Sequence, residues 1–193
     1  IGNAFTNNGT FSQIAGSRTT FNAPASGTLT SSLSGSGSST FGSVTIQGDR
    51  TINAGSYGFS VIGTGWQVSS GGTFNGGAAT VTFNPGAANT TTTSGTGNHY
   101  FNNVTISSGT LSYSAGTVRV SGNWTNNGTF TAGTSTVTFN GTSEQTIGGS
   151  SVTAFSNLTN NSGATIVIPT TNTPTVSGSL TNNGTLKQTR TVN

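Results

Sequence analysis

A short motif recurs along the chain and constrains its fold more than any other feature. It reads GNWTNNGTF at residues 122–130, GNAFTNNGTF at 2–11 and GSLTNNGTL at 178–186, with a weaker copy, GTGWQVSSGGTF, at 63–74. The aligned apolar residues are Phe5, Trp66, Trp124 and Leu180, which lie 61, 58 and 56 residues apart. A repeat of this length is typical of solenoids and other arrays, in which neighbouring units share one core.

Two further landmarks follow the same period of about 57 residues. TFN occurs at 20–22, 82–84 and 138–140, and a third motif reads TFGSVTI at 40–46, YFNNVTI at 100–106 and AFSNLTN at 154–160. We therefore divide a single domain, 1–193, into units 2–62, 63–120 and 121–177 and a partial unit 178–193. The shared register predicts a buried core that contains Phe21, Phe41, Phe83, Phe101, Phe139 and Phe155.

Within each unit the hydrophobic pattern alternates with period two. Val118 and Val120 flank Arg119, and Val137 and Phe139 flank Thr138, which is typical of half-buried strands. The runs are separated by turn sequences such as NNG and SAG, and no helical period is present. The pattern predicts an all-β chain with about six short strands in each unit.

Two architectures accommodate these strands. One is a β-solenoid of the parallel β-helix kind, in which coils stack about 4.8 Å apart. The alternative is a β-sandwich or jelly roll with strand exchange between subunits. A closed sandwich typically needs about 100 residues, and a shorter unit buries too little apolar surface alone. We therefore favour the solenoid.

The sparse charges exclude some functions. Only 4% of the residues are charged, against about 25% in an ordinary soluble domain. The net charge of +3 comes from five scattered cations, whereas nucleic-acid binding needs clustered ones. No apolar run approaches the roughly 20 residues that span a bilayer. Because the chain lacks Met and opens at Ile1, we expect a processed product or a fragment.

The residues that support catalysis or metal binding are too few. Asp49 and Glu144 are the only carboxylates, and they occupy different phases of different repeats. His99 is the only histidine and aligns with Ser39 and Thr153, so we expect a surface residue at the entry of a strand. Trp66 and Trp124 align with Phe5 and Leu180, which favours the core over a sugar-binding role. We predict no catalytic, cofactor-binding or metal-binding residue.

The strings NWTNNGTFTAGTSTVTFNGTSEQTIGGSS and FNNVTISSGTLSYSAGTVRVSGNWTNNGTF resemble repeats of large bacterial surface proteins. These are adhesin-like and haemagglutinin-like secreted proteins, usually regarded as β-solenoids. The resemblance extends over nearly the whole chain. It implies an extracellular or cell-surface location and a structural or adhesive role, and it implies no catalytic residue.

Both ends of the sequence carry the same part of the repeat, with Phe5 and Phe11 near one end and Leu180 and Leu186 near the other. We expect these four residues to form a subunit interface, through which the chain assembles head to tail by strand-edge pairing into an extracellular filament or surface fibre. The alternative is a passive adhesin or spacer segment of a larger cell-surface protein, with surface glycans or other cells as candidate partners. A carbohydrate-active β-helix enzyme is a weaker alternative.

Overall fold

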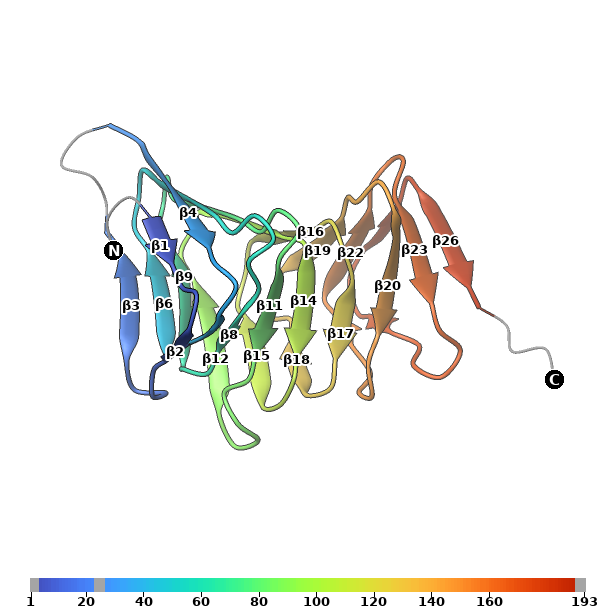
Figure 1. Cartoon of the computed structure of the whole chain (residues 1–193). Coiled ribbons are helices and arrows are strands. Elements are labelled where there is room, and N and C mark those ends of the chain that lie inside the picture. The colour runs from blue at the N-terminus through green and yellow to red at the C-terminus, as the bar shows by residue number, and fades with distance from the viewer. Residues whose placement is uncertain (1–3, 23–26, 190–193) are drawn as a thin grey trace.

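The strands of the chain wind into a three-sided coil, which a computed structural model describes for residues 4–22 and 27–189 (Figure 1). Successive strands lie on successive sides of the coil. Each strand pairs in parallel with the strand three positions earlier in the chain. The described residues contain strands, turns and bends but no helix. None of these residues therefore forms a helix that could cross a membrane.

Three parallel sheets make up the sides. The first sheet consists, in spatial order, of β1 (Ala4–Thr6), β4 (Leu29–Ser34), β7 (Arg50–Asn53), β10 (Thr73–Asn75), β13 (Asn98–Phe101), β16 (Thr117–Val120), β19 (Thr136–Phe139), β22 (Asn157–Asn160) and β25 (Leu180–Asn182). The second sheet consists of β2 (Thr10–Ser12), β5 (Ser38–Phe41), β8 (Phe59–Val61), β11 (Thr80–Phe83), β14 (Asn103–Ile106), β17 (Trp124–Asn126), β20 (Glu144–Gly148), β23 (Thr165–Ile168) and β26 (Thr185–Gln188). The third sheet consists of β3 (Arg18–Phe21), β6 (Ser43–Ile46), β9 (Gly65–Val68), β12 (Thr90–Ser94), β15 (Thr110–Tyr113) and β18 (Thr129–Thr131), and its side is continued by β21 (Ala154–Phe155) and β24 (Thr175–Val176).

The predicted β-solenoid is confirmed. The chain makes about eight coils of about 21 residues each. In the first sheet Ile52 pairs with Phe74, Phe74 with His99, and His99 with Val118, so each strand continues the ladder of the strand one coil earlier. A sandwich or jelly roll, the alternative, would have antiparallel strands, whereas every strand pair described here is parallel.

The sequence repeat and the coil have different lengths. The complete unit 63–120 contains the eight strands β9 to β16, and unit 121–177 contains the eight strands β17 to β24. The expected six strands per unit was therefore wrong, because strands of three or four residues are shorter than the alternating runs suggested. Because each coil contains three strands, the eight strands of a unit make two complete coils and two strands of a third. Equivalent residues consequently change sheet: Phe5 lies in the first, Trp66 in the third, Trp124 in the second and Leu180 again in the first.

The core fills the interior of the coil, as the alternation predicts. All six phenylalanines expected in the core are buried, and Trp66 and Trp124 are buried as well. Apart from Phe21, these residues take part in ring-to-ring contacts that follow one another along the axis. For example, the ring centroids of Trp66 and Phe74 are 4.9 Å apart, and those of Trp124 and Phe130 are 4.8 Å apart, both edge to face. Such edge-to-face pairs add stability beyond area burial alone.

Candidate assembly edges at the end coils

The described coil has an unpaired strand edge at each end. At the N-terminal end β1, β2 and β3 are the outermost strands of their sheets, and at the C-terminal end β24, β25 and β26 are. Figure 1 shows the two sets at opposite ends of the long axis. Unpaired backbone N–H and C=O groups of such strands are a template for a further strand.

Two of the predicted interface residues lie on the N-terminal coil. Phe5 and Phe11 are partly buried and pack against the core. Their ring centroids are 5.2 Å apart, and they lie 5.5 and 5.2 Å respectively from the ring of Phe41 on the next coil. These rings cover Phe41 and leave their own outer faces without a coil above them in the described structure.

The other two predicted interface residues lie on the C-terminal coil. Leu180 is 53% exposed and Leu186 is 36% exposed, and these are two of only four large hydrophobic side chains exposed in the described residues. Leu180 pairs with Leu158 and Leu186 with Ile166, so both continue inward-facing columns of the solenoid. They are exposed because no further coil lies above them in the part of the chain that the structure describes.

The structure places these four residues on the outermost described strands of two sheets. Phe5 and Leu180 lie in the first and last strands of the first sheet, and Phe11 and Leu186 do the same in the second sheet. Three repeats of eight strands make eight whole coils, and this returns the motif to the sheet where it began.

Where the NNG motif occurs, its asparagine side chains link that coil to the next one, as the copies at 7–9 and 126–128 show. Asn7 donates from Nδ2 to the carbonyl of Ser38 at 2.8 Å, and Asn126 donates from Nδ2 to the carbonyl of Val152 at 3.2 Å. The second asparagine accepts: Asn127 Oδ1 accepts the Ser150 backbone N–H at 2.9 Å, just as Asn8 Oδ1 accepts that of Ser36. Sequence analysis treated this motif as turn chemistry alone, although its repetition at one offset was the available signal.

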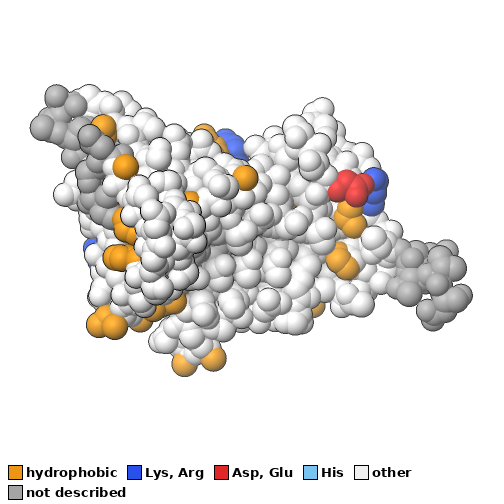
Figure 2. Space-filling view, viewed as in Figure 1, with side chains coloured by type: hydrophobic (Ala, Val, Ile, Leu, Met, Phe, Trp, Pro, Cys, Tyr) orange, Lys and Arg blue, Asp and Glu red, His pale blue; other side chains and the backbone are white. Residues whose placement is uncertain are grey.

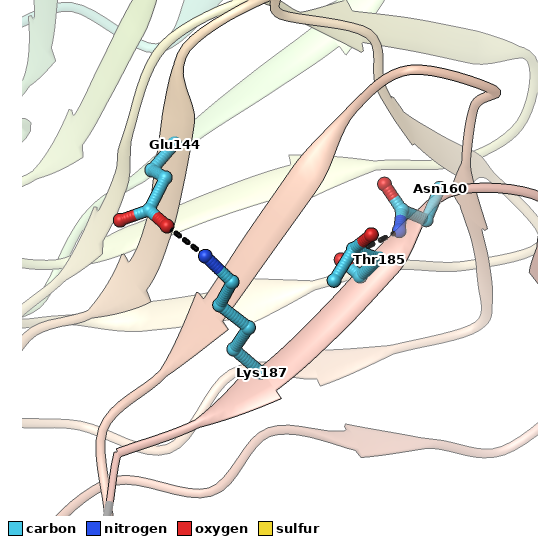
Figure 3. Close-up of polar contacts among 4 residues, drawn as sticks. All are labelled: Glu144, Asn160, Thr185 and Lys187. Carbon is cyan, nitrogen blue, oxygen red and sulfur yellow. Dashed lines mark hydrogen bonds and ion pairs between the residues drawn. The ribbon is translucent and has the colours of Figure 1, made fainter.

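The last copy of the motif, Asn182 and Asn183, lies on the terminal coil. Asn160 on the preceding coil donates from Nδ2 to Asn182 Oδ1 at 2.8 Å and to the carbonyl of Thr185 at 3.1 Å (Figure 3). In the earlier copies of the motif, the first asparagine donates from Nδ2, and the second accepts at Oδ1, across to the next coil. Across residues 4–22 and 27–189, Asn182 Nδ2 and Asn183 Oδ1 have no such partner. The edge therefore presents a donor and an acceptor in the arrangement that joins coils elsewhere.

Charge contributes little at this edge. Lys187 and Glu144 form an ion pair on the outer face of the second sheet, and the close-up shows it reaching across β23 (Figures 2 and 3). Both side chains are more than half exposed, so screening by water and salt keeps the contribution small. The pair neutralises Lys187, which removes one obstacle to close approach of another strand.

One expectation about His99 was wrong. It is buried within β13, at 4% exposure, and does not lie on the surface. Its Nδ1 accepts hydrogen bonds from Trp66 Nε1 at 3.2 Å and from the Tyr113 hydroxyl at 2.9 Å. Burial lowers the pKa of His99 to about 4 and raises the pKa of Tyr113. The sequence missed the site because Trp66 comes from an earlier coil and Tyr113 from another side of the same coil.

The candidate catalytic residues are not brought together. Asp49 lies in the turn before β7, with a positive φ of 56°, while Glu144 begins β20 several coils away and is paired with Lys187. Glycoside hydrolysis needs two carboxylates on either side of one bond. Within the described ranges no three His, Cys, Asp or Glu side chains gather into a metal-binding group.

Comparison with known proteins adds no family. No protein-family model matches the chain, and neither a curated protein nor a solved structure is significantly similar to it.

Proposed function

We propose that the chain is a non-catalytic structural subunit of an extracellular filament, which grows by stacking the C-terminal coil of one copy on the N-terminal coil of the next. The observation that carries this proposal is the phase of the end coils. Eight whole coils separate the first and last copies of the motif, so both open edges present the same two sheets. A stacked copy would continue the first and second sheets without a change of side.

The chemistry of the edges supports the same proposal. Leu180 and Leu186 offer apolar surface, Asn182 and Asn183 offer a donor and an acceptor, and Phe5 and Phe11 offer aromatic rings at the other end. Because the two edges differ, the contact would be heterologous, and a heterologous contact that does not close into a ring extends into a filament. The extracellular location rests on the resemblance to repeats of bacterial surface proteins.

A charge placed in the edge tests this proposal. In Leu180→Asp an acid would have to be buried between coils without a counter-ion, which is costly. We expect this variant to give single short rods by negative-stain microscopy and sedimentation, where the unchanged chain gives filaments. Val152→Asp is the matched control, because Val152 is similarly exposed, at 58%, but lies in the corner between β20 and β21, one coil before the outermost strands. It should form filaments of normal length.

Two outcomes would contradict the proposal. Filaments of normal length from Leu180→Asp would show that the C-terminal edge is not the contact. Monodisperse rods from the unchanged chain at every concentration would favour the alternative, a passive spacer or adhesin segment whose edges are covered by further coils of the same polypeptide.

A further inference from the structure

A cavity of about 390 Å³ opens between two corner loops that join the third sheet to the first. One loop, 94–97, joins β12 to β13, and the other, 114–117, lies at the same corner one coil later. The coil from Phe74 to His99 takes 25 residues, whereas the coil from His99 to Val118 takes 19. The additional residues of the first coil lie mainly in the loops 76–79 and 84–89, away from this corner, so the two corner loops are equal in length.

Each loop is tied to the coil on its far side. Gly97 N–H donates to the Val68 carbonyl at 3.0 Å, and a Cβ on Gly95, whose φ is +89°, would lie 2.0 Å from that same carbonyl oxygen. In the other direction, Thr134 N–H donates to the Ser114 carbonyl at 2.9 Å. One loop is thus held toward the preceding coil and the other toward the following coil, which keeps the space between them open.

The inner wall of the cavity is formed by Thr93, His99 and Tyr113, all more than nine-tenths buried. Trp66 Nε1–H can only donate, so His99 Nδ1, which accepts from it, carries no proton. The proton of the neutral ring is therefore on Nε2. No acceptor for that Nε2–H is found among the described residues, and His99 is one of the residues that line the cavity.

We propose that this cavity binds one residue of a neutral glycan, with His99 Nε2–H donating to a sugar hydroxyl. The other polar groups of the wall are hydroxyls and backbone groups, from Ser94, Thr96, Ser114 and Thr117 among others. No lining residue is charged. A charged ligand would lose its hydration without gaining a counter-ion, whereas a hydroxyl-rich neutral ligand exchanges its hydrogen bonds with water for similar ones. The volume is at the small end of the range for ligand pockets and suits a single sugar residue.

The single histidine makes this testable by NMR. His99 is the only histidine, so the imidazole signals of a ¹⁵N-labelled full chain belong to it alone. Methyl glucoside, methyl galactoside and methyl N-acetylglucosaminide would be titrated separately, with glucuronate as the charged comparison. We expect an unprotonated Nδ1 before ligand is added, and a saturable shift of the Nε2–H signal with at least one neutral glycoside.

Two variants separate binding in the cavity from other causes. Ala115→Phe places a ring at the cavity wall without touching the core, and it should weaken binding by about tenfold or more. Ala88→Phe makes the same change in an exposed loop that does not line the cavity, and it should bind as the unchanged chain does. The proposal is overturned by a protonated Nδ1, by no saturable shift with any neutral glycoside, by a tighter response to glucuronate, or by unaltered binding in Ala115→Phe.

Discussion

At the scale of single residues, the polar atoms inside the aromatic core distinguish equivalent repeats. Trp66 and Trp124 occupy the same position of the repeat, but Trp66 Nε1 donates to His99, whereas Trp124 Nε1 has no acceptor in the described structure. The residue aligned with His99 in the later repeat is Thr153, and its hydroxyl is also buried without a partner in the described structure. A buried donor without an acceptor lowers stability.

This difference predicts unequal costs for the same substitution. Trp66→Phe and Trp124→Phe each reduce ring volume in the core, but only Trp66→Phe removes a hydrogen bond. We expect Trp66→Phe to lower the free energy of unfolding by about 1 kcal/mol more than Trp124→Phe does. Urea denaturation followed by circular dichroism measures both values. An equal or larger cost for Trp124→Phe would contradict the assignment of the Trp66–His99 bond.

His99 also predicts a pH dependence. Its pKa is about 4 in the folded chain, against 6.5 for an exposed histidine, because burial disfavours the charged ring. Between these values the unfolded chain binds a proton that the folded chain does not, so stability falls as pH falls from 6.5 toward 4. Tyr113, its hydrogen-bonded neighbour, does not titrate there, because burial raises the pKa of that hydroxyl.

The loss between pH 6.5 and pH 4 should amount to about 3 kcal/mol at most. Thermal or urea unfolding across this range measures it, and stability should change little from pH 6.5 to pH 9. His99→Gln keeps an acceptor for Trp66 without a titrating group, so its profile should be flatter. A wild-type profile as flat as that of His99→Gln would rule out the buried neutral histidine.

At the scale of elements, alternation and turn chemistry were enough to predict strands, their inward faces and the solenoid. Val118 and Val120 are fully buried on either side of the more exposed Arg119, as their spacing indicated. The number of strands could not be predicted, since short strands separated by one or two residues merge into one alternating run, as β5 and β6 do. The position of His99 depended on Tyr113 and Trp66, which local sequence does not connect.

The asparagine contacts between coils predict a second matched comparison. Asn127 Oδ1 accepts the Ser150 N–H, whereas Asn183, at the same place in the repeat, has no such partner in the described coils. We expect Asn127→Ala to cost about 0.5–1.5 kcal/mol in unfolding free energy. Asn183→Ala should leave the isolated chain unchanged and weaken its assembly. A stability loss in Asn183→Ala equal to that in Asn127→Ala would count against an open terminal coil.

At the scale of the whole molecule, repeat number sets rod length. Each repeat adds eight strands, which is two coils and two strands. A chain in which residues 63–120 are duplicated should therefore be longer by about 13 Å, at about 4.8 Å per coil. Small-angle scattering or electron microscopy of the two chains measures the increment. An unchanged length would mean that the inserted unit loops out and does not join the coil.

The mismatch between repeat and coil has a consequence for how such a gene can change. Recombination between repeats gains or loses whole repeats. Each repeat turns everything beyond it by two thirds of a revolution about the axis, because eight strands leave a remainder of two in a coil of three. A feature carried once per repeat, such as the tryptophan position, therefore lies on a different side of the coil in each of three successive repeats. Only a change of three repeats, or a multiple of three, leaves the distant end in the same rotational orientation about the axis. The number of repeats therefore sets the orientation of that end as well as the length of the rod.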